Sequence, residues 1–154
     1  MKIAIVYYSK HHGNTKKLLD AITAQFDVTL IDAVHKKNME LAEYDMVGFA
    51  SGIYYSRFHE SVLRAAGEQL LPEQKVFLIY TYGVKNGGSK QSYTEDILAA
   101  VAKSGAVAAG KYCCPGWDTF GPFKLVGGIS KGRPNADDVD GAVEFFRKLT
   151  RSDK

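Results

Sequence analysis

The sequence has few cysteines, no long apolar run and no strong charge bias, and each absence excludes a class of protein. Two of its 154 residues are cysteines, Cys113 and Cys114, and they are adjacent. Adjacent cysteines can bridge only through a strained ring, so we expect two reduced thiols and no disulfide framework. No apolar stretch approaches the ~20 residues of a membrane span. The first residues, "MKIAIVYY", are too few for a signal peptide and lack a cleavage site, so we expect a cytoplasmic protein.

The charge and the histidines likewise argue against nucleic acid and metal. The formal net charge is +3 without a long run of lysine and arginine, so we expect no nucleic-acid partner. The four histidines, His11, His12, His35 and His59, have no metal-ligand spacing with the cysteines, and no Gly-x-Ser-x-Gly elbow is present. The composition, 45% hydrophobic and 24% charged, is that of an ordinary globular chain, and the length predicts one domain over 1–154.

Strand-like and helix-like segments alternate along the chain. Runs of β-branched and aromatic residues predict strands over 2–8, 27–32, 45–50, 75–81 and 106–112. Apolar residues at helical spacing predict helices over 15–26, 59–70, 91–104 and 137–150. This alternation predicts an α/β fold, in which parallel strands joined by right-handed crossovers form one doubly wound sheet. Ligands of such sheets bind beyond the carboxyl ends of the strands, so the segments after each strand are the candidate site.

The segment after the first strand, "SKHHGNT", predicts a phosphate cradle. It combines hydrogen-bond donors, positive charge and a turn-forming glycine at the start of a helix, whose free N–H groups attract anions. Its members are Ser9, Lys10, His11, His12, Gly13, Asn14 and Thr15. The alternative is that Asn14 or Thr15 only caps the helix. A nucleoside triphosphate is disfavoured because no Gly-Lys-Ser/Thr ending occurs, and a dinucleotide because Gly-x-Gly-x-x-Gly is missing. A single phosphomonoester fits best.

The same segment resembles the phosphate loop of the flavodoxin family, whose pattern is Ser/Thr-x-Thr-Gly-x-Thr. Ser9, Gly13, Asn14 and Thr15 match, and His11-His12 stands where a threonine and its neighbour are usual, so that an imidazole N–H would replace the hydroxyl. The resemblance extends over the whole β/α order. It implies a flavodoxin-like three-layer sandwich, with a five-stranded parallel sheet of order 2-1-3-4-5, helices on both faces and a bound FMN.

Two further segments would then hold the flavin ring. In 51–58, the resemblance implies a phosphate-binding hydroxyl and a ring-stacking aromatic, and the candidates are Ser51, Gly52, Ile53, Tyr54 and Tyr55. The alternative for the two tyrosines is that they pack under a surface loop. In 81–94, the candidates are Thr81, Tyr82 and Gly83, with Asn86 and Ser89 as additional donors. Tyr93 is expected to open the next helix.

The long Gly/Pro-rich segment 113–136 carries Trp117, Phe120 and Phe123. These aromatics either pack against the sheet end and the last helix, or form a lid over the flavin edge or a docking surface for a partner. Trp117 is the candidate cofactor contact among them.

Charge near the ring predicts an unusual redox property. The segments 51–58 and 81–94 contain no Asp or Glu but do contain Arg57, Lys85 and Lys90. Positive charge favours an anionic hydroquinone, so we expect a smaller gap between the two one-electron potentials than in acidic flavodoxins.

Three functions remain open from the sequence. The first is FMN-mediated electron transfer with redox partner proteins. The second is an FMN-dependent NAD(P)H oxidoreductase acting on quinones or other small acceptors. The third is a non-redox phosphate-binding or regulatory module, such as a receiver-like domain, which is disfavoured because Ser9-Lys10 and Ser51-Gly52 occupy the positions of its acidic residues. The oligomeric state is open.

Overall fold

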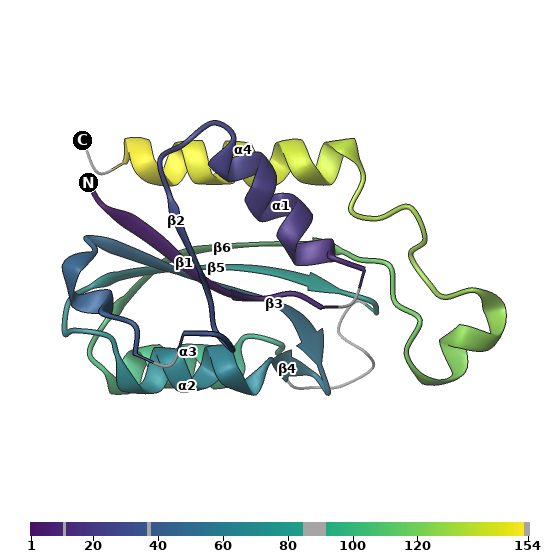
Figure 1. Cartoon of the computed structure of the whole chain (residues 1–154), viewed down its shortest axis with the longest axis horizontal. Coiled ribbons are helices and arrows are strands. Elements are labelled where there is room, and N and C mark those ends of the chain that lie inside the picture. The colour runs from purple at the N-terminus through teal and green to yellow at the C-terminus, as the bar shows by residue number, and fades with distance from the viewer. Residues whose placement is uncertain (11, 37, 85–91, 153–154) are drawn as a thin grey trace.

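Five parallel strands form the centre of the molecule (Figure 1). The structure is a computed structural model that describes residues 1–10, 12–36, 38–84 and 92–152. The strands run in the order β2-β1-β3-β5-β6. Their bounds are β1 (Ile3–Tyr8), β2 (Thr29–Asp32), β3 (Met46–Tyr54), β5 (Lys75–Tyr82) and β6 (Val107–Pro115). Counted without the short β4, this is the predicted order 2-1-3-4-5, which is confirmed.

The strand β4 (Arg57–Phe58) was not predicted. It pairs antiparallel with the end of β3, joining Ile53 to Phe58 and Tyr54 to Arg57. Only Tyr55 and Ser56 lie in the turn, and both have a positive φ, 50° and 65°. This is the left-handed geometry of a two-residue hairpin, which asparagine and glycine adopt more readily than tyrosine and serine.

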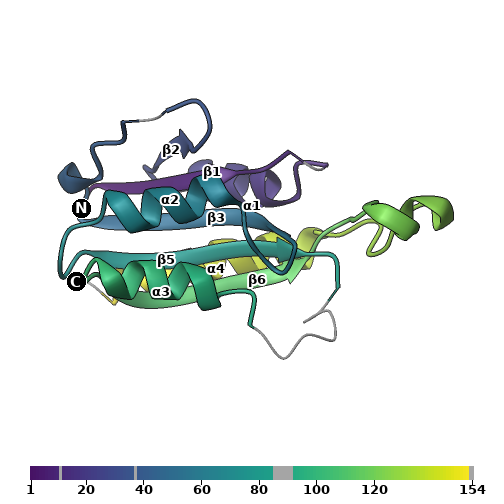
Figure 2. The same ribbon diagram turned by 90° about the horizontal axis from the view of Figure 1, so that it is seen from below.

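Helices cover both faces of the sheet, as predicted (Figure 1, Figure 2). One face packs against α1 (Asn14–Thr23) and α4 (Ala136–Arg151), and the other against α2 (Glu60–Glu68) and α3 (Glu95–Lys103). Successive β1 residues alternate between these layers. Ala4 and Val6 join the core under α2 and α3, whereas Ile3 and Ile5 join the core under α1 and α4. Burial on both faces explains the continuous apolar runs of the strands.

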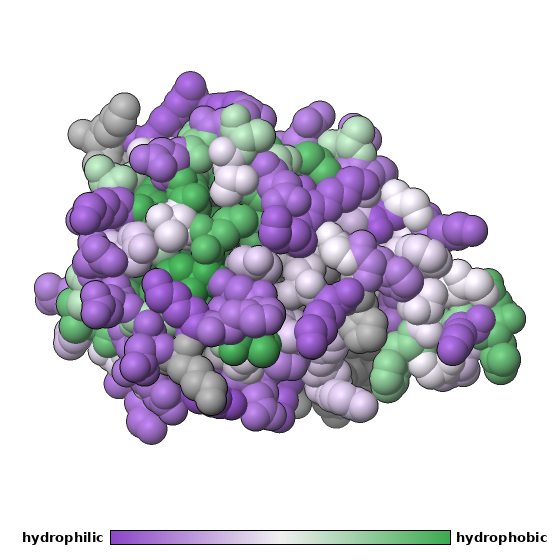
Figure 3. Space-filling view, viewed as in Figure 1, coloured by the Kyte–Doolittle hydropathy of each residue, from purple (hydrophilic) through white to green (hydrophobic). Residues whose placement is uncertain are grey.

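Residues 117–133, called the arm below, project beyond the carboxyl ends of the strands (Figure 1, Figure 2). The arm closes at its base, where the Trp117 N–H donates to the Arg133 carbonyl at 2.9 Å, and it carries the short helix η3 (Gly121–Val126) near its tip. The tip is hydrophobic in the space-filling view (Figure 3). A second short helix, η1 (Leu41–Glu43), precedes β3.

Two of the helices begin at side-chain N-caps. Asn135 caps α4 in a capping box with Asp138, and the His59 side chain caps α2. Cys113 is exposed and Cys114 is buried, and both are free thiols. Within the described ranges, no helix has the length and apolar character needed to cross a bilayer.

Candidate functional site

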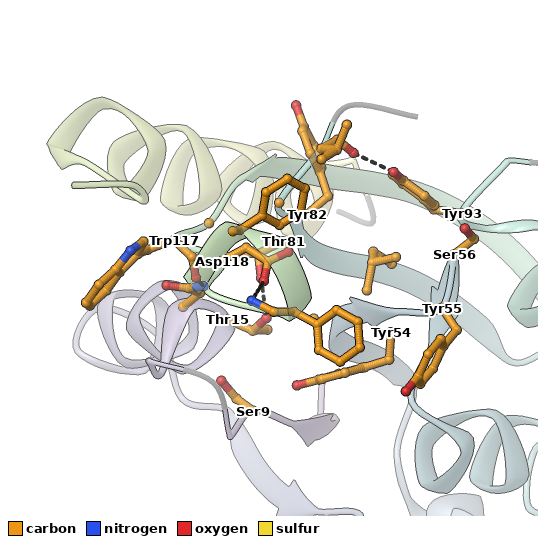
Figure 4. Close-up of a pocket in the computed structure, with 18 residues that line it drawn as sticks. Ser9, Thr15, Tyr54, Tyr55, Ser56, Thr81, Tyr82, Tyr93, Trp117 and Asp118 are labelled. Atoms are coloured by element: carbon orange, nitrogen blue, oxygen red, sulfur yellow. Dashed lines mark hydrogen bonds between the residues drawn. The ribbon is translucent and has the colours of Figure 1, made fainter. Parts of the chain in front are cut away.

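A cavity of about 290 Å³ lies at the carboxyl ends of the strands, between the segments after β1, β3 and β5 and the base of the arm (Figure 4). Most of the predicted site residues line it. They are Ser9, Asn14, Thr15, Gly52, Ile53, Tyr54, Tyr55, Thr81, Tyr82, Gly83 and Trp117. The alternation of strand and helix therefore brings together side chains that are far apart in the sequence, such as Asn14 and Trp117 at a separation of 103 residues.

Four of the predicted residues lie near the cavity without lining it, namely Lys10, His12, Gly13 and Ser51. The Ser51 hydroxyl is buried, accepts the His59 N–H at 3.0 Å and donates to the Gly52 carbonyl. Both of its hydrogen bonds are therefore to backbone groups in this structure. The remaining predicted residues, His11, Lys85, Asn86, Ser89 and Lys90, fall outside the described residues.

One end of the cavity is the N-terminus of α1. Gly13 precedes the helix as its N-cap residue in the left-handed conformation, with φ of 63°, and it has no side chain to accept a helix N–H. The alternative that Asn14 or Thr15 is a plain cap is therefore not what the structure shows. Asn14 donates instead to the Trp117 carbonyl at 2.8 Å, and Ser9 Oγ accepts the Lys16 N–H at 3.1 Å. The first N–H groups of a helix have no partner within it, so this end is suited to an anion.

Two buried threonine hydroxyls form the floor between α1 and β5. Thr15 Oγ1 and Thr81 Oγ1 lie 2.9 Å apart, and both residues are almost fully buried. In the view of Figure 4 they lie between Trp117 on one side and the tyrosines of the β3–β4 hairpin on the other. This hydrogen bond ties the start of α1 to the carboxyl end of β5.

Aromatic rings form the rest of the wall. Tyr54 and the strongly exposed Tyr55 come from the β3–β4 hairpin, and Tyr82 is the last residue of β5. Tyr93 also lines the cavity and donates its hydroxyl to the Val84 carbonyl, whereas it was expected to open a helix that in fact begins at Glu95. Burial raises the pKa of Tyr82 and of Tyr93, so both phenols are neutral at physiological pH.

The arm supplies the last wall. Trp117, Phe120 and Phe123 all line the cavity. The arm contacts the first loop, because the His12 ring stacks on Trp117 with centroids 3.9 Å apart. It also contacts the hairpin, because Phe120 and Tyr55 meet edge to face at 5.7 Å.

Asp118 is a wall residue that sequence reasoning missed. Its Oδ1 accepts the Phe120 N–H at 2.8 Å, and its carboxylate lies so close to Gly83 that a Cβ there would fall 2.2 Å from Oδ2. The charge argument from the sequence covered only 51–58 and 81–94 and therefore overlooked this carboxylate. Its position soon after the last strand of the sheet was the available signal. Ser56, Val84 and Gly116 are further lining residues that were not predicted.

The residues present fit FMN, the cofactor that the flavodoxin resemblance implies. A phosphate dianion needs N–H and hydroxyl donors, which the α1 end offers with the helix N–H groups and the hydroxyls of Ser9 and Thr15. A flat tricyclic ring needs flat apolar partners, which Tyr54 and Tyr82 offer. Both requirements are met within one cavity.

Comparisons with known proteins agree with this geometry. Residues 5–119 match the flavodoxin domain family. An uncharacterized protein of Methanocaldococcus jannaschii is 33% identical over 154 residues, which cover 99% of this chain and 100% of that protein. Oxidised flavodoxin 1 of Bacillus cereus matches with a TM-score of 0.67 at 16% identity, covering 98% of each chain. General stress protein 14 of Treponema denticola, in complex with FMN, matches with a TM-score of 0.62 at 14% identity, covering 96% of this chain and 98% of that chain. This chain belongs to the flavodoxin family.

Proposed function

We propose that this protein holds one FMN in the cavity and transfers electrons through it to a partner protein. The observation that carries the proposal is that two unlike ends meet in one cavity. One end is a helix N-terminus with hydroxyl and amide groups, and the other is a wall of aromatic rings. FMN has the two matching parts, a phosphate and a flat ring. Membership of the flavodoxin family and the FMN complex of the similarly folded T. denticola protein support the same cofactor.

The chain's own residues would bind and orient the cofactor. The N–H groups at the start of α1, together with the Ser9 and Thr15 hydroxyls, would hold the phosphate. Tyr54 and Tyr82 would each offer a ring face to the flavin and keep water from it. When bound, FMN supplies one- and two-electron redox chemistry, and the protein sets its potential.

The mouth of the cavity favours a protein as the electron acceptor. Tyr55 and Phe120 at the mouth are 86% and 59% exposed, and Leu125 and Val126 near the tip of the arm are 89% and 76% exposed. Exposed apolar side chains gathered in one region mark an interaction surface. A flavin edge emerging at this mouth would lie beside that surface.

A second candidate is an FMN-dependent NAD(P)H oxidoreductase acting on quinones or other small acceptors. The observation that favours it is the arm, which brings Trp117, Asp118 and Phe123 into the cavity wall. A flat aromatic acceptor would meet apolar rings on the arm as well as on the hairpin.

Absorbance of the purified protein and titration of the apo form with FMN test the cofactor. A colourless protein that fails to bind added FMN would refute the proposal.

Two variants that each add one negative charge distinguish electron transfer to a partner protein from reduction of a small acceptor. Val126→Glu alters the exposed tip of the arm without altering a cavity residue, and Val107→Glu alters an exposed valine on β6. If a protein is the acceptor, Val126→Glu slows electron transfer to cytochrome c, used as the probe, relative to Val107→Glu. If the protein is instead a small-molecule reductase, both variants retain rapid NAD(P)H oxidation with menadione, and wild-type transfer to cytochrome c is slow.

A further inference from the structure

The imidazole of His59 is part of a three-ring cluster with Tyr8 and Tyr54. The rings of Tyr8 and His59 lie flat on each other, with centroids 3.5 Å apart and planes 9° apart. Tyr54 meets both rings edge-on, with centroid distances of 5.5 Å in each case. Tyr54 lines the cofactor cavity, whereas Tyr8 and His59 do not. The stacked pair therefore supports Tyr54 from the side away from the cavity.

Hydrogen bonds hold the imidazole in one state. His59 Nδ1 caps α2 by accepting the Ser61 backbone N–H at 3.2 Å, and it lies 2.7 Å from Ser61 Oγ. The His59 backbone N–H donates to Ser51 Oγ in β3 at 3.0 Å. A nitrogen that accepts an N–H carries no proton, so the ring in this arrangement is neutral, with its proton on Nε2. Protonation of Nδ1 would place its N–H against the Ser61 N–H, and because two donors cannot share a hydrogen bond, the cap would be lost.

We infer that His59 is a positioning residue for the cofactor: its neutral imidazole holds Tyr54 in the wall of the FMN site, and its protonation loosens that wall. The inference rests on the proposed function, because it assigns Tyr54 to a flavin. It makes FMN affinity dependent on pH through a residue that does not itself line the cavity.

Burial favours the neutral state of His59, although charged groups surround it. The titratable groups that face His59 come from the end of β1, from β3, from the segment after β2 and from α2. They are Lys10, Tyr8, Tyr54, Lys36, Glu60, Arg64 and Glu68. Burial lowers the pKa of His59, the charge of Glu60 opposes this, and the charge of Lys10 reinforces it. Because the folded-state pKa lies below the ordinary value of 6.5, the neutral arrangement is complete above that pH and is lost as the pH falls through the folded-state pKa.

The test compares the full chain with His59→Asn and His35→Asn. Asparagine is a good N-cap, so the first variant keeps the cap of α2 but removes the ring and its titration. His35 is exposed and pairs with Asp32, so its variant controls for the loss of any histidine. FMN dissociation constants are measured by flavin fluorescence between pH 8 and pH 5. For wild type and His35→Asn we expect weaker binding at low pH, by about tenfold for each unit by which FMN lowers the pKa of His59. His59→Asn should bind more weakly at pH 8 and lack this step. An equal pH dependence in wild type and His59→Asn overturns the inference.

A measurement on the apo protein separates this inference from the proposed function. Near-ultraviolet circular dichroism of the tyrosines should change between pH 8 and pH 5 in wild type and not in His59→Asn. A wild type that binds no FMN at pH 8 refutes the proposed function, whereas an unchanged tyrosine signal refutes the role of His59. If His59→Asn does not fold, Tyr8→Leu serves instead. It removes the stacked ring and leaves the cap, so the midpoint of the signal should move to higher pH, and an unmoved midpoint overturns the inference.

Discussion

The hydrogen bond between Thr15 and Thr81 gives a sharp test of how the site is held together. The two hydroxyls are 2.9 Å apart, and the residues are 1% and 3% exposed, so neither can turn to water. Thr15→Val leaves the Thr81 hydroxyl buried without its partner, which costs about 1–3 kcal/mol. Thr81→Val does the same to Thr15. Replacing both by valine removes the two polar groups together, so the double variant should lose far less stability than the sum of the single variants, with a coupling of about 1–2 kcal/mol.

Urea unfolding of the apo protein measures these free energies, and each kcal/mol should also lower the melting temperature by roughly 2–4 °C. The matched control is Thr23→Val at the other end of α1, where the hydroxyl donates to the Asp20 carbonyl in an exposed hydrogen bond. It should stay within about 0.5 kcal/mol of wild type. Thr15→Val should also weaken FMN more than riboflavin, because only FMN has the phosphate. Strictly additive single and double variants would refute the reasoning, since they would mean that the two hydroxyls do not depend on each other.

Three further outcomes are expected. Gly83→Ala should destabilise the fold and disturb the arm, because the new Cβ would fall 2.2 Å from the Asp118 carboxylate. Gly67→Ala, whose Cβ meets open space within α2, should instead raise the free energy of unfolding by about 0.5–1 kcal/mol. Equal effects of the two variants in urea unfolding would contradict this. Asp118→Asn removes a negative charge from the cavity wall and should raise the second one-electron potential of bound FMN by roughly tens of millivolts, as measured by redox titration. An unchanged potential would mean that this carboxylate lies too far from the flavin to influence its potential. The hydrogen bonds from Arg133 lower the pKa of Asp138. Their contribution to stability is therefore present above the ordinary pKa of 3.8 and is lost as the pH falls below that value through the folded-state pKa. Asp138→Asn should flatten this part of the pH–stability curve.

Much of the fold was predictable because burial leaves a periodic trace in the sequence. Strands covered on both faces appear in the sequence as continuous apolar runs, and helices covered on one face appear as apolar residues at helical spacing. The order of strands and helices therefore followed directly from the sequence. The rule of right-handed crossovers then limited how the strands could be arranged.

The features that were missed depend on geometry that the sequence does not mark. The β3–β4 hairpin turns at Tyr55 and Ser56, which carry none of the glycine or asparagine that usually signals a left-handed turn. Asp118 becomes a wall residue only because the arm folds back on itself, through bonds such as that from the Asp118 N–H to the Ile129 carbonyl at 3.0 Å. Tyr93 was expected to open a helix that begins two residues later, at Glu95.

The placement of the two chain ends has a practical consequence. Figure 1 marks both at the end of the sheet opposite the arm, and Ser152, just past α4, shares a surface groove with Lys75 and Val107 at the amino ends of β5 and β6. A fused fluorescent reporter, a purification tag or a tether to an electrode could be joined at either end without crowding the mouth of the cavity. The protein could thus be immobilised in one orientation, with the mouth of the cavity directed toward solution.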